Sequence, residues 1–340
     1  MGYLDDIQRV SAIGLPWNKI SGCDILVTGA TGLIGSSLVE VLMAHRGRDF
    51  GVYVMGRNAL RMQRLFERHI KSDGFHMLVG DVTEPLLSDH SFQYIIHAAS
   101  GASPSAFSHN PVETMKANIL GVTNLIEYGM RHNLHRFLYV SSGEIYGEGD
   151  GRCFTEDYSG YVDCTSPRSC YPSSKRAAET LCASYAAEYG VDVVIARPCH
   201  TFGPNFTEND NRVYAQFIRD ILNNHDIVMK STGEQYRSWC YVVDCVSGLL
   251  HILLKGKNGE AYNIADPDSS IRIGELAQMI ASIGKKKVVF DIPTSDEKRG
   301  YNPVSQSVYC VDKLKQLGWG VYRDMYSNIL STIDYLRNGL

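Results

Sequence analysis

The sequence predicts an α/β fold with a doubly wound parallel sheet and a smaller C-terminal lobe. Three observations lead to this prediction. Short apolar runs typical of buried strands alternate with helical stretches, and a glycine-rich segment joins the first such run to the first long helix. From about residue 198 onward, the alternation loosens into loops and short helices. Strands and helices that alternate at this spacing favour a parallel sheet with right-handed crossovers.

The predicted elements follow one another without an internal repeat. Strands are expected at residues 23–28, 52–55, 76–79, 94–97, 136–141 and 191–196. Helices are expected at residues 33–45, 60–70, 112–131 and 171–189. In the later part we expect loops at residues 203–211 and 263–270 and short helices at residues 276–283 and 312–317. This part should form a lobe over the carboxyl ends of the strands, where ligands of open α/β sheets usually bind.

Composition narrows the class of protein. The formal charge is -4 and 21% of residues are charged, so no basic footprint for nucleic acid is present. The first six residues lack the basic-then-apolar order of a signal peptide, and no apolar run approaches the roughly 18 residues of a membrane span. The nine cysteines form no C-x-x-C pair, which argues against zinc and for reduced thiols. We therefore expect a cytoplasmic protein that binds no metal, nucleic acid or membrane.

The segment Gly29-Ala30-Thr31-Gly32-Leu33-Ile34-Gly35 lies between the first predicted strand and its helix. Its glycines permit a tight turn and close backbone approach, and the helix N-terminus can stabilise a pyrophosphate. A plain turn is the alternative. The strand–loop–helix context favours a Rossmann-type dinucleotide-binding domain at residues 23–197, with later segments returning to it. Residues 1–22 would then be an N-terminal extension, and residues 198–340 mainly a substrate-binding lobe.

The end of the second predicted strand bears on the choice of cofactor. The segment Tyr53-Val54-Met55-Gly56-Arg57-Asn58 carries no carboxylate for a ribose 2′-hydroxyl. Arg57 can instead accept a 2′-phosphate, which favours NADP over NAD. A solvated loop arginine is the alternative, so the prediction is NAD or NADP.

Two further strand ends carry candidate cofactor residues. In Gly80-Asp81-Val82, the Asp81 carboxylate and the adjoining Val82 can meet an adenine ring, or Asp81 is an ordinary loop residue. In Ala98-Ala99-Ser100, small side chains allow a cofactor to pass close to the backbone. His97 precedes them and is expected to be a packed strand-end histidine.

Tyr171 and Lys175 are spaced one helical turn apart, so an ammonium can lie beside a phenol. A nearby positive charge favours the phenolate, which makes tyrosine a usable base. The same spacing also arises by chance on exposed helices. After the strand that begins near Arg136, the Ser142 hydroxyl can bond the reacting oxygen, and the Glu144 carboxylate can act as base, acid or electrostatic guide, or be a solvated loop residue.

Together, these motifs resemble the extended short-chain dehydrogenase/reductase family of nucleotide-sugar epimerases, dehydratases and decarboxylases, over residues 24–319. The resemblance implies a Rossmann fold, bound nicotinamide, a nucleoside-diphosphate sugar and oxidation of the sugar 4-hydroxyl to a transient ketone. It makes Tyr171 the base and implies that Lys175 lowers its pKa and holds the nicotinamide ribose. It also implies that Ser142 bonds the substrate and that Asn118 supports the backbone of the active site.

Several longer segments look most like UDP-glucuronate decarboxylases. They are the segments at residues 80–86, 99–104, 110–112, 167–181 and 237–244. The last contains Arg237, which resembles an arginine that meets the sugar diphosphate, and we expect His200 and Arg212 to bind substrate as well. Paired helices at residues 112–131 and 171–189 would form a homodimer, as is common in the family.

Departures from the decarboxylase pattern leave other reactions open. Gly143 stands where those enzymes carry serine and dehydratases carry aspartate, His200 replaces an asparagine, and residues 305–307 replace an arginine. The alternatives are therefore a nucleotide-sugar 4-epimerase or dehydratase, or an NADP-dependent keto-sugar reductase. A non-catalytic cofactor-binding sensor is a more distant alternative, against which the intact serine, tyrosine and lysine argue.

Overall fold

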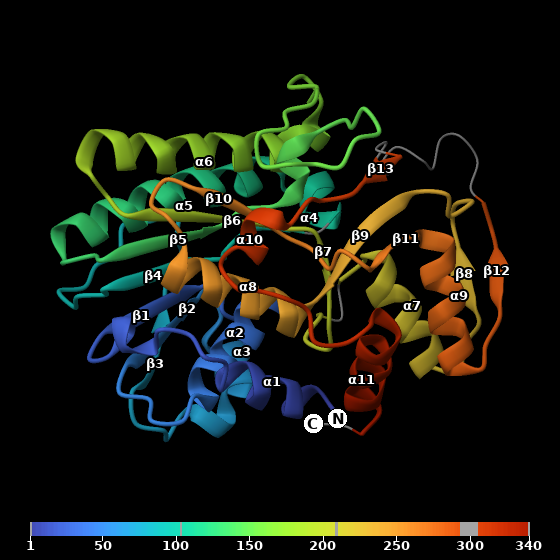
Figure 1. The fold of residues 1–340 in the computed structure, drawn as a ribbon, viewed down its shortest axis with the longest axis horizontal. Helices are drawn as coiled ribbons and strands as arrows, with labels where there is room; N and C mark the ends of the chain where they lie inside the picture. Colours follow the sequence, from blue (N-terminus) through green and yellow to red (C-terminus); the bar gives the residue numbers. More distant parts are fainter. Residues whose placement is uncertain (1, 103, 208–209, 293–304, 339–340) are drawn as a thin grey trace.

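The computed structural model describes residues 2–102, 104–207, 210–292 and 305–338 (Figure 1). Its centre is a seven-stranded sheet in which every paired neighbour is parallel. The strands are β1 (Asp24–Thr28), β2 (Gly51–Gly56), β3 (Phe75–Val79), β4 (Tyr94–His97), β5 (Arg136–Val140), β6 (Val193–Pro198) and β10 (Ala261–Ile264). They lie in the order β10-β6-β5-β4-β1-β2-β3. The chain adds β2 and β3 on one side of β1 and then adds the later strands on the other side. The predicted doubly wound parallel sheet is confirmed.

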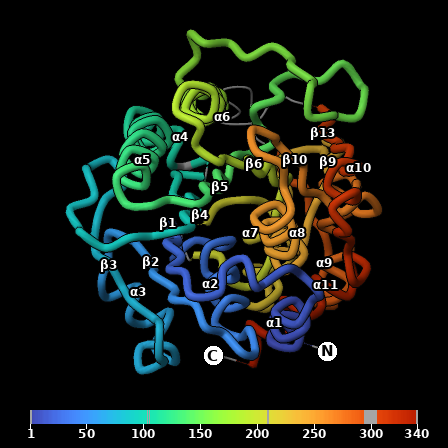
Figure 2. The backbone as a smooth tube through the Cα atoms, turned by 60° about the vertical axis from the view of Figure 1, so that its left-hand side comes forward, coloured from blue at the N-terminus to red at the C-terminus, as the bar shows by residue number. Residues whose placement is uncertain are grey.

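Helices cover both faces of the sheet (Figures 1 and 2). The long helices are α2 (Leu33–Ala44), α5 (Pro111–Arg131), α6 (Cys170–Tyr189) and α8 (Val242–Lys255). Alternate strand residues enter different cores: Val27 packs with the α2 and α8 side chains, whereas Leu26 packs with those of α5 and α6. Strands buried on both faces read as continuous apolar runs, which is why they were visible in the sequence.

One predicted loop is shorter in the structure, where it spans residues 265–269. Residues 263–270 begin inside β10, which pairs with β6 as the last strand of the large sheet. This strand comes after the smaller lobe has begun, so its partner lies far away in sequence. The helix predicted at residues 60–70 is also shorter, because α3 (Ala59–Leu65) ends and a short 3₁₀ turn follows at Glu67–His69.

The smaller lobe lies at the carboxyl ends of the strands, on the right of Figure 1. Its strand β9 (Tyr236–Tyr241) pairs with β7 (His200–Phe202), β11 (Ser270–Arg272) and β13 (Gln306–Ser307). A second pair joins β8 (Ile227–Met229) to β12 (Val288–Phe290). Helices α7 (Val213–Leu222) and α9 (Ile273–Gly284) pack together beside these strands.

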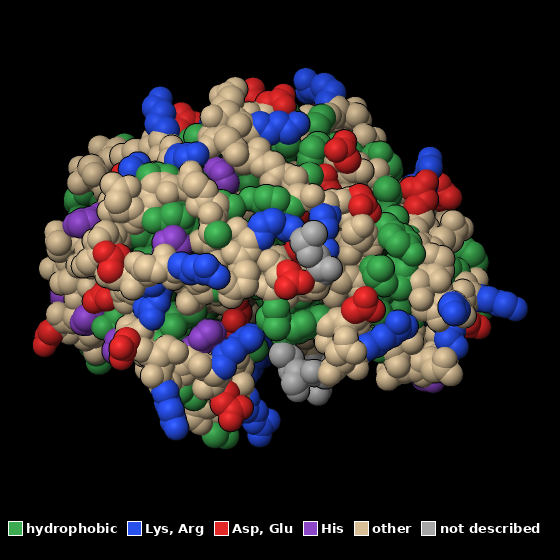
Figure 3. All heavy atoms as spheres, turned by 60° about the horizontal axis from the view of Figure 1, so that its bottom comes forward, with side chains coloured by type: hydrophobic (Ala, Val, Ile, Leu, Met, Phe, Trp, Pro, Cys, Tyr) green, Lys and Arg blue, Asp and Glu red, His purple; other side chains and the backbone are tan. Residues whose placement is uncertain are grey.

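The N-terminal extension contains a helix, α1 (Tyr3–Ser11), that packs against α2, α8 and α11 (Met325–Arg337). Buried Asp6 forms ion pairs with Arg9 and Arg323, the latter just before α11. Both termini therefore lie close together, at the bottom of Figure 1. Seen from that side, acidic and basic side chains are interspersed (Figure 3). No helix among the described residues has the length and apolar character needed to span a bilayer.

Candidate active site

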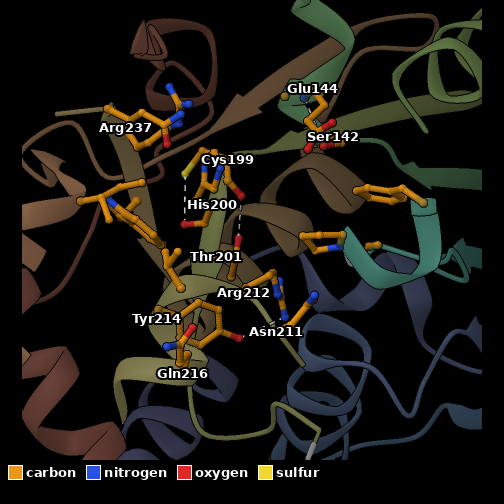
Figure 4. Close-up of a pocket in the computed structure, with 18 of the residues that line it drawn as sticks. Ser142, Glu144, Cys199, His200, Thr201, Asn211, Arg212, Tyr214, Gln216 and Arg237 are labelled. Carbon is orange, nitrogen blue, oxygen red and sulfur yellow. Dashed lines mark hydrogen bonds between the residues drawn. The ribbon is translucent and has the colours of Figure 1, made fainter. Parts of the chain in front are cut away.

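A cavity of about 560 Å³ opens where the smaller lobe meets the ends of β5 and β6. This volume is within the usual range for sites that bind small molecules. Ser142 and Glu144 lie on one side of the cavity, and Arg237 lies across from them beyond Cys199 and His200 (Figure 4). Arg212 and Tyr214 lie farther along the same cavity (Figure 4).

Tyr171 lies in the first turn of α6 and lines the cavity. Its ring stacks on Phe107, with centroids 4.6 Å apart, and only 6% of the residue is exposed. Burial raises the pKa of the phenol, whereas a hydrogen bond from Ser142 and the charges of Arg212 and Arg168 act in the opposite direction. The tyrosine and serine predicted to act together thus line the same cavity and lie close enough to interact.

Lys175 lies one turn further along α6 and is buried. Its Nζ donates to the Val140 carbonyl at 2.8 Å and lies 5.7 Å from the centroid of the Tyr171 ring. Burial lowers the pKa of this ammonium to about 7. Tyr171 and Lys175 therefore lie close together, as predicted. Lys175 is not among the described residues that line the cavity.

Asn118 fixes the backbone under Tyr171. Its Nδ2 donates to Ser174 Oγ at 2.9 Å, and that hydroxyl donates to the Tyr171 carbonyl at 3.1 Å. The chain of hydrogen bonds ties α5 to the first turn of α6. The supporting role that the family resemblance implies for Asn118 stays a prediction, and these hydrogen bonds are the contacts through which it would act.

Glu144 is paired with Arg168, a residue that the sequence did not single out. The two guanidinium nitrogens contact both carboxylate oxygens at 3.1–3.3 Å. The Ser142 hydroxyl also accepts a hydrogen bond from the Glu144 amide at 3.2 Å, which caps the short helix at Gly143–Tyr146. Arg168 stands just before α6, but sequence spacing alone could not show which carboxylate it meets.

The glycine loop forms a close turn at the start of α2. Gly29 has a φ of +66°, and a Cβ there would lie 2.5 Å from the Ala99 nitrogen and 2.6 Å from the Ala98 carbonyl carbon. A Cβ at Gly35 would lie 2.3 Å from the Gly29 carbonyl oxygen. The loop, strand β4 and helix α2 can approach this closely only with glycines. Thr31, Gly32, Leu33 and Ile34 lie in the same turn and the first residues of α2.

Buried polar atoms after β4 and on α5 and α6 fit a dinucleotide. Among the described residues, Ser100 Oγ, Ser173 Oγ and Asn118 Oδ1 are buried without hydrogen-bond partners. Such atoms are costly unless a bound group or water satisfies them. The glycine turn, residues 98–100 and the Tyr171–Lys175 pair would therefore hold a nicotinamide dinucleotide.

Arg57 and Asp81 meet at the ends of β2 and β3. Arg57 Nη1 lies 3.7 Å from Asp81 Oδ2, and 80% of the arginine side chain is exposed. Partial burial opposes ionisation of Asp81, but hydrogen bonds from Thr83 and the charge of Arg57 hold its pKa below the usual value. Val82 beside it is buried in the core under α5. Arg61, which sequence reasoning missed, donates to the Thr31 carbonyl at 2.8 Å and braces the glycine turn.

His97 is packed, as expected. It is fully buried, and its Nδ1 lies 2.8 Å from Thr28 Oγ1. Burial and the nearby Lys175 charge lower its pKa to about 3, so the ring is neutral.

The four residues predicted to bind substrate, which are Ser142, His200, Arg212 and Arg237, all line the cavity. Arg212 is held by Asp210, with Nε 2.9 Å from Oδ1. Burial, with the charges of Arg237 and Arg212, lowers the pKa of His200 to about 3. The neutral ring has a buried Nδ1 without a partner among the described residues. The buried Arg237 guanidinium and the half-buried Arg212 guanidinium, with a neutral imidazole, suit an anionic ligand.

Comparison with known proteins shows which family this chain resembles. The sequence model of the NAD dependent epimerase/dehydratase family matches residues 25–265. UDP-glucuronic acid decarboxylase 1 of Xenopus tropicalis is 32% identical over 320 residues, covering 93% of this chain and 72% of the relative. UDP-glucuronic acid decarboxylase 6 of Arabidopsis thaliana is 34% identical over 302 residues, covering 88% of this chain and 84% of the relative.

Solved structures share the fold. UDP-glucose 4-epimerase of Thermotoga maritima, solved with UDP-glucose, superimposes with a TM-score of 0.79 at 24% identity and covers 93% of this chain and 99% of its own. A dTDP-glucose 4,6-dehydratase of Streptomyces venezuelae, solved with NAD, gives 0.81 at 21% identity, covering 93% and 97%. The matching family model and the two decarboxylase relatives each extend over most of this chain. The chain therefore belongs to the NAD dependent epimerase/dehydratase family and is an enzyme of that class.

Proposed function

We propose that this enzyme is a UDP-glucuronate decarboxylase that uses tightly held NAD. The observation that carries the proposal is that the Ser142 hydroxyl and the buried Tyr171 phenol lie near one another at the wall of the same cavity. A sugar hydroxyl placed between these two groups meets one group that can take its proton and one that can hold its oxygen. Relatives named as UDP-glucuronic acid decarboxylases at 32–34% identity support the choice of substrate.

The nucleotide-sugar diphosphate would bind at the cationic end of the cavity. Arg212 and Arg237 supply guanidinium groups whose forked geometry matches phosphate oxygens. His200, neutral because of its lowered pKa, has an unpartnered Nδ1 for a sugar or phosphate oxygen. These contacts orient the sugar toward Tyr171 and Ser142.

Tyr171 would take the proton of the sugar 4-hydroxyl. Positive charge must favour the phenolate, because burial raises the pKa of the phenol. Arg212 and Arg168 already act in that direction, and the Lys175 amine lies 5.7 Å from the ring centroid. Bound NAD supplies the hydride acceptor for this oxidation and the donor for the later reduction.

Oxidation at C4 makes the C5 carboxylate a leaving group. The C5–C6 bond breaks and carbon dioxide departs. The electron pair of that bond stays on the sugar as an enolate, which the C4 ketone stabilises. Protonation at C5, hydride return to C4 and return of the proton from Tyr171 to the C4 oxygen then give a UDP-pentose, so no net oxidant is consumed. The Glu144–Arg168 ion pair lies next to Ser142. From there, its charges can influence the negative charge that develops on the sugar.

The test is incubation of the purified protein with UDP-glucuronate, with carbon dioxide and the nucleotide product measured by mass spectrometry and NMR. We expect carbon dioxide and a UDP-pentose, and NAD in the denatured protein. Tyr171→Phe should lower turnover by at least a thousandfold while keeping bound NAD, since the base is lost but the cofactor turn is intact.

Tyr185→Phe is the matched control, because Tyr185 lies on the same helix with its hydroxyl on Glu127, away from the cavity. It should retain wild-type turnover. Failure of the wild type to release carbon dioxide, or near-normal turnover by Tyr171→Phe, would overturn the proposal; a 4-epimer as product would instead favour the epimerase.

We also propose a homodimer formed through α5 and α6, and a reducing compartment such as the cytoplasm. Helices α5 and α6 lie side by side on one face of the sheet (Figures 1 and 2). Large apolar side chains exposed on them include Val112, Met115, Leu120, Met130 and Tyr189. An exposed apolar face of this kind is typical of an association surface.

All nine cysteines are free thiols, which suits a reducing compartment.

A further inference from the structure

Tyr309 fills the space above Gly143 in the active-site cavity. A Cβ at Gly143 would lie 2.1 Å from the Tyr309 hydroxyl oxygen, 2.3 Å from Cε1 and 2.4 Å from Cζ. Both residues line the cavity, although they come from distant parts of the sequence. The glycine at this position therefore accommodates an aromatic ring that approaches from the C-terminal lobe.

The ring of Tyr309 is held firmly. The Ser307 hydroxyl donates to the Tyr309 hydroxyl at 2.8 Å, and the Tyr309 amide donates to Ser238 Oγ at 3.3 Å. The ring meets Phe154 edge to face, with centroids 5.6 Å apart. Only 5% of the residue is exposed. A side chain fixed in this way is preorganised to recognise a ligand.

The Tyr309 hydroxyl has one hydrogen left to donate. In the described part of the chain it accepts from Ser307 and forms no hydrogen bond as a donor. Burial raises the pKa of this phenol far above its ordinary value, so it stays protonated and remains a donor. Arg237 is near enough for its charge to act on the phenol. A donor beside a guanidinium complements a carboxylate better than a neutral hydroxymethyl group.

We propose that Tyr309 is a specificity-determining residue whose hydroxyl donates a hydrogen bond to the carboxylate of a uronic-acid nucleotide sugar. This inference rests on the proposed function, which puts the reacting 4-hydroxyl at Ser142. Gly143 is the next residue, so a phenol over it lies next to substituents on the carbons that flank C4. The carboxylate on C5 is such a substituent, and Tyr309 thereby supplies a polar contact that a side chain at residue 143 could have made.

The test compares wild type with Tyr309→Phe, which keeps the ring and removes only the hydroxyl. Calorimetry measures the affinity for UDP-glucuronate, UDP-glucose and UDP, alongside kcat and KM for carbon dioxide release. We expect the affinity and kcat/KM for UDP-glucuronate to fall about tenfold, with the affinity for UDP within about twofold of wild type, because one hydrogen bond to a charged group is lost. Tyr158→Phe is the control, since its hydroxyl donates to the Glu148 carbonyl and does not line the cavity.

The outcomes separate this inference from the proposed function. If wild type releases carbon dioxide and Tyr309→Phe equals it, the role of Tyr309 is overturned and the decarboxylase stands. If wild type releases none, yet Tyr309→Phe selectively weakens UDP-glucuronate relative to UDP and UDP-glucose, carboxylate recognition is supported and the decarboxylase falls. Equal weakening of all three ligands would show that Tyr309 only maintains the shape of the cavity, and would overturn its assigned role.

Discussion

Lys175 brings a titratable amine into a position almost closed to water. Only 2% of the residue is exposed, and burial lowers its pKa to about 7. Below that pH the ammonium is charged in the folded and the unfolded protein, so folding carries the full cost of burying it. Between the folded pKa and the ordinary lysine value near 10.5, the unfolded chain binds more protons, and stability rises with pH.

Replacing the amine should remove this dependence. After bound NAD has been removed from both proteins, Lys175→Met should unfold at a higher temperature than wild type at pH 6, and the difference in unfolding temperature should narrow toward pH 9. The narrowing corresponds to about 1 kcal/mol per pH unit above the folded pKa. Thermal unfolding at four pH values measures it, with exposed Lys257→Met as the control that should follow wild type. A gap that stays constant over this range would contradict the lowered pKa.

Individual residues differ in how far the sequence could predict them. Tyr171 and Lys175 could be paired because their contact is set by one helical turn. Arg168 and Tyr309 could not, because their contacts with Glu144 and Gly143 depend on how separate loops and lobes fold together. The sequence shows a missing side chain at residue 143, but only the folded chain shows that a distant ring fills the space.

Among the elements, the turn from β1 to α2 is the most constrained by backbone approach. Its Gly29 combines a left-handed φ with contacts that leave no room for a side chain. The sheet strand β4 and the helix α2 are therefore fixed relative to one another at the proposed cofactor site. The pattern of glycines could predict this turn because a tight strand-to-helix turn requires them locally, whereas the close approach of Gly29 to residues 98 and 99 depends on the whole fold.

Gly29→Ala should lower the free energy of unfolding by about 3 kcal/mol and abolish NAD retention, because the new Cβ would collide with the backbone of residues 98 and 99. Gly190→Ala is the matched control: its φ is +69°, but nothing lies within 4 Å of its Cβ. That variant should lose only about 1 kcal/mol and keep NAD. Urea unfolding and mass spectrometry of the bound nucleotide measure both. Equal losses in the two variants would mean that the conformation, rather than the collision, sets the cost.

Strand β10 marks the limit of prediction at this scale. Its four residues are too few to give a clear period, and they follow a lobe that interrupts the alternation of strands and helices. Only pairing with β6 makes them part of the large sheet. Strand pairing over such a separation depends on the whole fold.

Over the whole molecule, the alternating apolar runs predicted the sheet, whereas the connections that close the structure were not visible. In the N-terminal extension, α1 packs against α2 and α8 of the large domain and against the C-terminal helix α11. Its Tyr3 hydroxyl contacts Ser37 at 3.0 Å and accepts from Asn205, just after β7, at 2.8 Å. These contacts link three distant parts of the chain, so no local sequence pattern could predict them.

The proposed association surface gives a prediction at the same scale. Leu120→Arg places a charge on the exposed apolar face of α5, where Leu120 is 39% exposed, and should convert a dimer into monomers. Leu87→Arg makes the same change at a residue that is 94% exposed and outside these helices, and should leave the dimer intact. Light scattering after size-exclusion chromatography measures the mass. A monomeric wild type would remove the proposed dimer.

The contact between Gly143 and Tyr309 also constrains how this protein can change over evolutionary time. A serine or aspartate at residue 143 has no room while the Tyr309 ring lies 2.1–2.4 Å from the position of its Cβ. Loss of the ring first would open a hole beside the substrate, and gain of the side chain first would create a collision. The two positions are therefore expected to covary among descendants of this sequence, and a shift to another sugar would require both codons to change together.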